Sequence, residues 1–176
     1  MKQLIATCVV GMLLVACHSN TQTSEEKIIN DSIARAPGEL ERKKEERNKE
    51  TAIASVMAFG RHDTAGVFKA AAANFVDYGD GSFPPVKGKD SVTASIAIFI
   101  KAFSDIHVRD ITAISEGDSV AVFAQWIGTF KNPLMGIPPT GITTILRDCD
   151  VYEFNKAGRI TSHRATQNVS QYLRKK

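Results

Sequence analysis

The sequence predicts an α+β fold, in which helices from the first half of the chain cover one face of a sheet of about four long antiparallel strands. In the first half, apolar residues recur at three- and four-residue spacing, which is typical of helices that bury one face. From Ile106 onward the spacing of apolar residues changes to two, which is typical of strands. Helices followed by a run of strands indicate helices that are segregated on one side of the sheet.

The first residues have the composition of a secretion signal. Lys2 gives a positive start, and residues 4–16 are apolar but too few to remain in a bilayer as a spanning helix. Small and apolar residues directly before Cys17 resemble the lipobox of bacterial lipoproteins, in which cleavage leaves a lipidated cysteine. We therefore expect a lipoprotein signal peptide at residues 1–16 and a protein of the bacterial cell envelope, anchored to a membrane with its domain outside the cytoplasm. The alternative is a plain signal peptide with a chance cysteine.

Cysteine usage agrees with a lipid on Cys17. Cys8 would leave with the signal, and Cys149 would then be a lone thiol with no internal disulfide to form. Residues 17–38 are polar and mixed in charge, so we expect them to tether a domain at residues 39–176 to the membrane.

Three helices are expected at the start of the domain. The first is residues 39–60, where charges of both signs recur at three- and four-residue spacing and a glycine ends the pattern. The second begins with Asp63 or Thr64 as its cap, and the third begins with Asp90 or Ser91.

The strands are expected in the second half, after one short strand at residues 74–78. The long strands are expected at residues 106–115, 119–130, 142–154 and 159–167, followed by a last helical turn at residues 168–173. Strands of this length must curl, and helices that lie across a curled sheet leave a cavity between the two layers.

The loop at residues 128–141 has an unusual composition. Its three glycines and three prolines exclude a helix or a central strand. It nevertheless carries apolar side chains that a solvent-exposed turn does not need, namely Phe130, Leu134, Met135 and Ile137. The loop is either a long hairpin connection or a lid over a pocket.

The sequence resembles a known family, the SnoaL-like polyketide cyclases and ester cyclases. The resemblance covers residues 50–173 and rests on several short segments. Among them are Phe75-Val76-Asp77-Tyr78, Gly128-Thr129, Gly136-Ile137-Pro138-Pro139-Thr140-Gly141, and the hairpin from Phe154 to Ile160. The resemblance implies a nuclear transport factor 2-like cone of curved antiparallel sheet, a pocket inside it, and the glycine- and proline-rich loop near its mouth. It also implies that domains pair as homodimers through the sheet.

The resemblance further implies acid–base chemistry by an aspartate near the end of the last strand. Counted from Ile160, the family's tryptophan and aspartate positions hold Arg164 and Asn168 in this chain. An amide neither gives nor takes a proton near neutral pH. This favours a binding module over an enzyme, and no cofactor is expected.

Cross-strand counting gives a candidate site. If Phe154 and Ile160 both face the core, Asp150 lies opposite Arg164 and Tyr152 lies on the same face. The two charges would form an ion pair that either orients a ligand or only satisfies two buried groups.

The predicted ligand-binding residues combine aromatic and apolar side chains with a few polar ones. They are Tyr78, Trp126, Phe130, Met135, Ile137, Asp150, Tyr152, Arg164 and Asn168. If catalysis persists, Asp150 and Asp77 are the candidates for it. The alternative role of Trp126 is packing in the core. The alternative role of Asp77 and Tyr78 is to form a turn. His163 has the opposite parity to Arg164, so we expect it to face solvent. No histidines have metal-ligand spacing, and no metal site is expected.

Three functions stay open. The first is a lipid-anchored cone that binds a small, largely apolar molecule. The second is an isomerase-, cyclase- or hydratase-type enzyme with a different carboxylate set, and the third is a structural, dimerising envelope domain whose cone is filled by its own side chains. An uncompensated carboxylate in an apolar pocket would favour the enzyme, and a charge-compensated one would favour binding. The net charge is only +3 and no basic stripe is interleaved with aromatics, so no nucleic-acid partner is expected.

Overall fold

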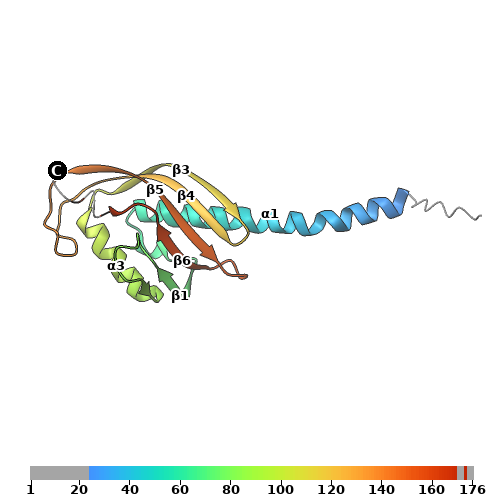
Figure 1. The fold of residues 1–176 in the computed structure, drawn as a ribbon, viewed down its shortest axis with the longest axis horizontal. Coiled ribbons are helices and arrows are strands. Elements are labelled where there is room, and N and C mark those ends of the chain that lie inside the picture. Colours follow the sequence, from blue (N-terminus) through green and yellow to red (C-terminus); the bar gives the residue numbers. More distant parts are fainter. Residues whose placement is uncertain (1–23, 170–172, 174–176) are drawn as a thin grey trace, which may run out of the picture. The chain divides into compact units, whose positions relative to one another are not determined.

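The computed structural model describes residues 24–169 and Leu173, with side chains from Pro37 onward. Helices come first and long strands second, which confirms the predicted α+β fold (Figure 1). The elements are α1 (Ser24–Gly60), α2 (Thr64–Val67), β1 (Ala71–Asp77), β2 (Val86–Lys87), α3 (Lys89–Ala102), β3 (His107–Glu116), β4 (Ser119–Thr129), β5 (Thr143–Phe154) and β6 (Ile160–Ala165). Of the predicted final turn, residues 170–172 lie outside the described residues.

The strands form one curved sheet in the order β2-β1-β6-β5-β4-β3. The long strands pair antiparallel, as predicted, but β1 pairs with β6 in parallel, so the sheet is mixed. The short edge strand β2, which follows Pro84-Pro85, was not predicted. The parallel pairing matters for the site because it brings the end of β1 beside the end of β6.

Helix α1 begins at Ser24, earlier than the predicted residue 39, and it continues through Pro37. A proline inside a helix removes one backbone hydrogen bond, but it does not oblige the helix to end there. The flanking residues include glutamates, lysines and arginines, which have good helix propensity. Cys17 lies outside the described residues, and the tether stays a prediction.

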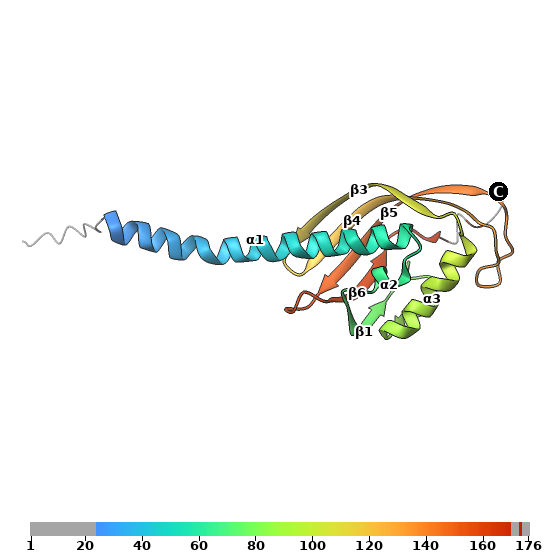
Figure 2. The same ribbon diagram turned by 180° about the vertical axis from the view of Figure 1, so that it is seen from behind.

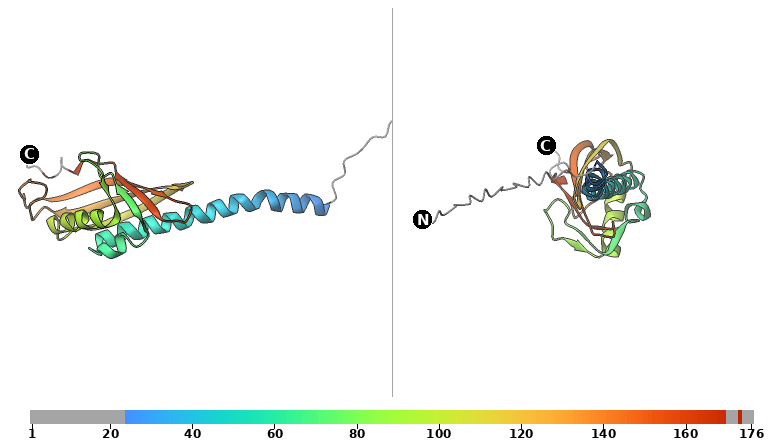
Figure 3. Two further views of the ribbon diagram at one scale, coloured as in Figure 1. Left: turned by 90° about the horizontal axis from the view of Figure 1, so that it is seen from below. Right: turned by 90° about the vertical axis from the view of Figure 1, so that its right-hand side faces the viewer.

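The core lies between the helices and one face of the sheet. Figures 2 and 3 show α3 and the C-terminal half of α1 on the same side of the long strands. Burial alternates along β4, where Val120, Val122 and Ala124 are buried, as the period of a half-buried strand requires. These valines pack against Val56 of α1 and Val92 of α3 in one apolar cluster.

The two later helices differ in how they begin. Asp63 caps α2 as predicted, because its side chain accepts a hydrogen bond from the Gly66 N–H at 2.9 Å. Helix α3 begins at Lys89, after Gly88, rather than with Asp90 or Ser91 as the cap. Gly88 has a φ of 89°, a conformation that glycine adopts without strain, so the chain turns into the helix slightly earlier than predicted.

Candidate ligand-binding site

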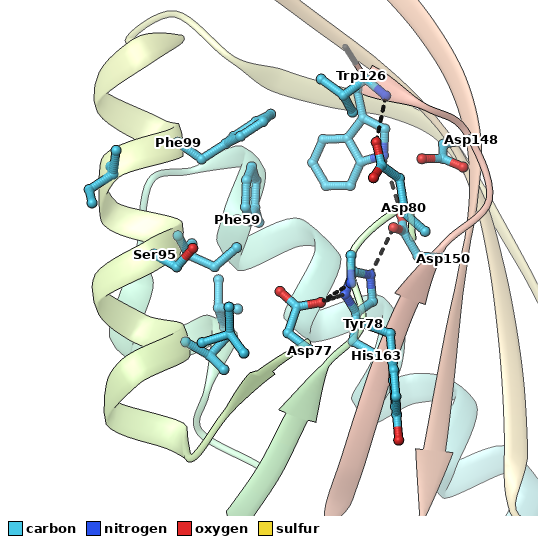
Figure 4. A pocket seen from close by; sticks show the side chains of 18 of the residues that line it. Phe59, Asp77, Tyr78, Asp80, Ser95, Phe99, Trp126, Asp148, Asp150 and His163 are labelled. Atoms are coloured by element: carbon cyan, nitrogen blue, oxygen red, sulfur yellow. Dashed lines mark hydrogen bonds and ion pairs between the residues drawn. The ribbon is translucent and has the colours of Figure 1, made fainter. Parts of the chain in front are cut away.

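A cavity of about 510 Å³ lies between the sheet and the helices. Its walls are largely apolar and aromatic, with Phe59 from α1, Phe99 from α3 and Trp126 from β4 among them (Figure 4). Phe59 contacts both of the other rings, with centroid distances of 5.9 Å to Phe99 and 5.1 Å to Trp126. These three rings, which we call the aromatic panel, form one continuous part of the wall.

A bulge at the start of β6 decides which side chains enter the cavity. Phe154 pairs with Ile160, as predicted, but the next pair is Glu153 with Ser162, so Thr161 is an extra residue. One extra residue shifts all later side chains of the strand to the opposite face. The cavity therefore receives His163 in place of Arg164.

The predicted ion pair between Asp150 and Arg164 is consequently wrong, as is the predicted solvent-facing position of His163. Asp150 lies opposite Ala165 in the sheet, and its carboxylate contacts His163. The Arg164 side chain is exposed and lies over the Tyr78 ring, with 5.2 Å between the guanidinium carbon and the ring centroid.

His163 bridges two carboxylates, that of half-buried Asp77 and that of buried Asp150. Its Nδ1 is 2.9 Å from Oδ1 of Asp77, and its Nε2 is 3.0 Å from Oδ1 of Asp150. The indole N–H of Trp126 donates to Oδ2 of Asp150 at 3.3 Å, and the Gly79 N–H donates to Oδ1 of Asp77 at 2.9 Å. The polar network, Asp77-His163-Asp150-Trp126, thus crosses the adjacent strands β1, β6, β5 and β4 on their inner face (Figure 4).

The two carboxylates hold His163 in its protonated form. Burial would lower the pKa of His163, but the hydrogen bonds and charges of Asp150 and Asp77 outweigh it and raise the pKa to about 10. For Asp77, burial would raise the pKa, but the bond and charge of His163 lower it below its ordinary value. At neutral pH the imidazolium therefore donates both N–H groups, and Asp77 is an ionised carboxylate with little tendency to take up a proton.

Two further aspartates line the cavity. Asp80, after β1, accepts backbone hydrogen bonds from Ser82 at 2.8 Å and Val169 at 3.0 Å. Asp148, on β5, accepts through Oδ1 from the N–H groups of Cys149, Thr166 and Gln167, and from the Thr166 hydroxyl at 2.8 Å. Asp148 was not among the predicted site residues, although the period of two along β5 places it on the same face as Asp150.

The predicted site residues divide into two groups by their place in the structure. Those that line the cavity are Asp77, Tyr78, Trp126, Met135, Ile137, Asp150 and Tyr152. Phe130 is buried in a second apolar cluster, where it stacks on Phe103 at a centroid distance of 5.3 Å. Asn168 donates its side-chain N–H to the Ser82 hydroxyl at 2.8 Å and, like Arg164, lies outside the cavity lining.

The glycine- and proline-rich loop reaches the cavity from the end of β4. Its base is fixed to the end of α3, because the N–H groups of Lys131 and Asn132 both donate to the Ala102 carbonyl. Further along, Leu134 and Ile137 exchange two backbone hydrogen bonds around a tight turn. At its tip, Met135 has a φ of 51° and is 62% exposed, although it also lines the cavity.

Met135 offers a test of the role of this loop. Asparagine tolerates positive φ better than methionine, so Met135→Asn is expected to raise the free energy of unfolding by about 0.5–1 kcal/mol. The same change removes an apolar side chain from the cavity, so affinity for an apolar dye should fall a few-fold. Urea unfolding and titration with Nile red measure the two effects. Met135→Leu keeps the apolar contact and is the matched control; equal dye binding by both variants would contradict a ligand contact at this position.

Comparison with known proteins agrees with this architecture. The family model for the SnoaL-like polyketide cyclase matches residues 51–175. Among solved structures, one from Jannaschia sp. CCS1 named as a SnoaL-like polyketide cyclase has a TM-score of 0.66 at 20% identity, over 73% of this chain and 90% of the other. Among curated proteins, none matches the chain closely enough to count as a relative.

Two other similar structures contain small molecules. RV0760c from Mycobacterium tuberculosis, in complex with estradiol-17beta-hemisuccinate, has a TM-score of 0.56 at 23% identity, over 70% of this chain and 95% of the other. A protein with a ketosteroid isomerase-like fold from Catenulispora acidiphila DSM 44928, in complex with trimethylamine, has a TM-score of 0.57 at 18% identity, over 69% and 87%. At these identities the likeness establishes the fold alone.

Proposed function

The chain belongs to the SnoaL-like polyketide cyclase family, and from that premise we propose that it binds a small, largely apolar molecule in its cavity without the family's cyclase chemistry. The observation that carries the proposal is the state of the cavity carboxylates. His163 compensates Asp77 and Asp150, and the pKa of Asp77 is lowered rather than raised. A carboxylate of this kind orients a ligand better than it abstracts a proton.

Size and shape support the same proposal. A cavity of about 510 Å³ is within the usual range for small-molecule sites, which are mostly apolar with a few convergent polar groups. The third sequence-based alternative, a domain with a filled interior, does not fit a cavity of this volume. The small molecules in the two similar structures belong to those proteins, and they support only the general expectation that this fold holds ligands.

Blocking the cavity tests the proposal. Ser95 lines the cavity from α3, so Ser95→Trp is expected to fill it and to lower the affinity for Nile red, a neutral apolar dye, by about tenfold or more. Ala94→Trp is the matched control, because Ala94 is exposed on the same helix. Fluorescence titration measures both variants. Equal dye binding by the two variants, or no binding by the unchanged protein, would contradict a ligand site in the cavity.

A second candidate function is acid–base catalysis, and one observation favours it. His163 joins two carboxylates within hydrogen-bond distance, an arrangement that can pass a proton between them. Catalysis by Asp77 as a base would need substrate binding to raise its pKa toward neutrality. Isomerase or cyclase turnover that disappears in Asp77→Asn, while Nile red still binds, would place this function ahead of simple binding.

We also propose, from the sequence, that Cys17 carries a lipid that anchors the domain to a membrane of the cell envelope. The support is the apolar stretch and the lipobox-like residues before Cys17. Among the described residues, no helix is long and apolar enough to cross a membrane. Incorporation of a labelled fatty acid by the natural protein, and its loss in Cys17→Ser, would support the anchor.

Pairing into a homodimer is the remaining part of the proposal. Apolar side chains on the outer face of β3, β4 and β5 are exposed, namely Ile114, Phe123 and Ile145. An exposed apolar sheet face of this kind is typical of a surface that pairs with another molecule. Sedimentation of the purified domain, compared with that of a Phe123→Lys variant, would show whether this face pairs.

A further inference from the structure

Most of the charged side chains that line the cavity are negative. Of the described lining residues, four are aspartates, one is the imidazolium of His163, and none is lysine or arginine. The whole chain has the opposite balance, with a net charge of +3. The negative excess therefore belongs to the cavity rather than to the protein surface in general.

The four carboxylates differ in their hydrogen-bond partners. Asp80 and Asp148 accept bonds from backbone N–H groups and, for Asp148, also from the Thr166 hydroxyl, and all of these donors are uncharged. His163 carries the one positive charge, and Asp77 and Asp150 share it. The cavity as a whole therefore has more carboxylates than cationic groups, and a cation is the kind of ligand that balances this excess, because buried charges favour a partner of opposite sign.

One carboxylate oxygen is placed to receive that partner. Both hydrogen bonds to Asp77 reach Oδ1, from His163 and from the Gly79 N–H; none from the described part of the chain reaches Oδ2. Figure 4 shows this second oxygen directed away from His163, toward the part of the cavity in front of α3. The Asp77 side chain is only 14% exposed, so a ligand group that meets Oδ2 would lie inside the cavity.

The aromatic panel suits the same kind of ligand. Phe59, Phe99 and Trp126 line the space that Asp77 faces (Figure 4). Aromatic faces attract cations, with tryptophan the strongest, and they also pack against apolar groups. A ligand with an apolar body and a positive head satisfies the panel and the carboxylates together, whereas an anion would meet more negative than positive groups.

We propose that the ligand is an amine: a small molecule with an apolar body and a protonated ammonium group, which donates a hydrogen bond to Oδ2 of Asp77. This rests on the proposed function, because it names the class of molecule that the same cavity binds. Neutral molecules of the same shape bind less tightly, and the corresponding carboxylates bind least.

A matched series of ligands tests the proposal. Naphthylmethylamine, naphthylmethanol and naphthoate share one ring system and differ in the charge of the head group. Calorimetric titration of the unchanged domain at neutral pH is expected to give at least about tenfold tighter binding for the amine than for the alcohol, and no measurable binding of the carboxylate. If the alcohol or the carboxylate binds as well as the amine, the proposal is overturned but the cavity remains a ligand site. If neither this series nor Nile red binds, the proposed function itself fails.

Isosteric variants then show which carboxylate causes the preference for the amine. Asp77→Asn is expected to weaken amine binding by about tenfold while changing alcohol binding by less than about twofold. Asp110→Asn is the matched control, because Asp110 is exposed outside this cavity, and it should change neither affinity. If Asp77→Asn proves unfolded by circular dichroism, Asp80→Asn removes another cavity charge and is expected to weaken the amine selectively as well. Equal amine affinity in the folded cavity variant and in the control would overturn the proposal.

Discussion

His163→Phe is expected to lower the free energy of unfolding by about 3–5 kcal/mol at neutral pH. Phenylalanine keeps a ring of similar size but removes the positive charge and both N–H donors. Buried Asp150 and half-buried Asp77 would then both lack the cation that they share. Breaking a buried ion pair by removing one partner is costly because it leaves an uncompensated charge.

Urea unfolding of His163→Phe and of His107→Phe makes the comparison direct. His107 is exposed on β3, so its replacement should change stability by no more than about 0.5 kcal/mol. The triple variant Asp77→Asn, Asp150→Asn, His163→Phe removes all three charges together. It is expected to recover much of the lost stability, because neutral groups of similar shape replace the whole charged set. Equal stability of His163→Phe and His107→Phe would mean that His163 carries no structural charge in the fold.

The order of elements could be predicted from the sequence because it depends on local patterns. A three- and four-residue spacing before Ile106 and a two-residue spacing after it are sufficient to place helices before strands. The parallel pairing of β1 with β6 could not be predicted in this way. It joins segments far apart in the chain, and nothing in the local pattern of residues 71–77 or 160–165 specifies its partner.

The prediction of the site residues depended on a shift of one residue in the pairing of β5 with β6. The alternation along β5 correctly put Asp150 and Tyr152 on the inner face, since that strand is regular from Thr143 to Phe154. The facing strand contains the extra residue Thr161, whose hydroxyl donates to the Glu153 carbonyl at 3.1 Å. A bulge leaves no clear signal in a single sequence. Counting across the hairpin therefore placed Arg164 in the cavity, where the structure has His163.

The charge inside the cavity follows from this change of partner. An arginine beside Asp150 would have left Asp77 without a counterion, whereas His163 reaches both carboxylates from one position between β1 and β5. The presence of Asn168 at the family's aspartate position also says less about the function than the sequence suggested. Asn168 bonds to Ser82 outside the cavity lining, and the polar groups that a ligand would meet come from other strands.

Stability is expected to depend on pH with a maximum between about pH 4 and pH 6.5. His163 has a pKa of about 10 in the folded protein against 6.5 in the unfolded chain, so the folded state binds its proton more tightly. Its stabilising contribution is complete below pH 6.5 and is lost as the pH rises toward 10. Asp77 acts on the acid side, because its folded pKa lies below the ordinary 3.8; its contribution is present above that value and is lost as the pH falls through the folded pKa.

The loss of stability at alkaline pH gives the clearer test of the role of His163. One proton released on unfolding gives a slope of about 1.4 kcal/mol per pH unit, so stability should fall by about 4 kcal/mol between pH 6.5 and 10. Burial also raises the pKa of the Cys149 thiol above 9.0, which adds a loss of the same sign. Urea unfolding is therefore measured in a Cys149→Ser background, with and without His163→Phe. The slope above pH 6.5 should disappear when His163 is replaced, and a slope that persists would assign the alkaline loss to another group.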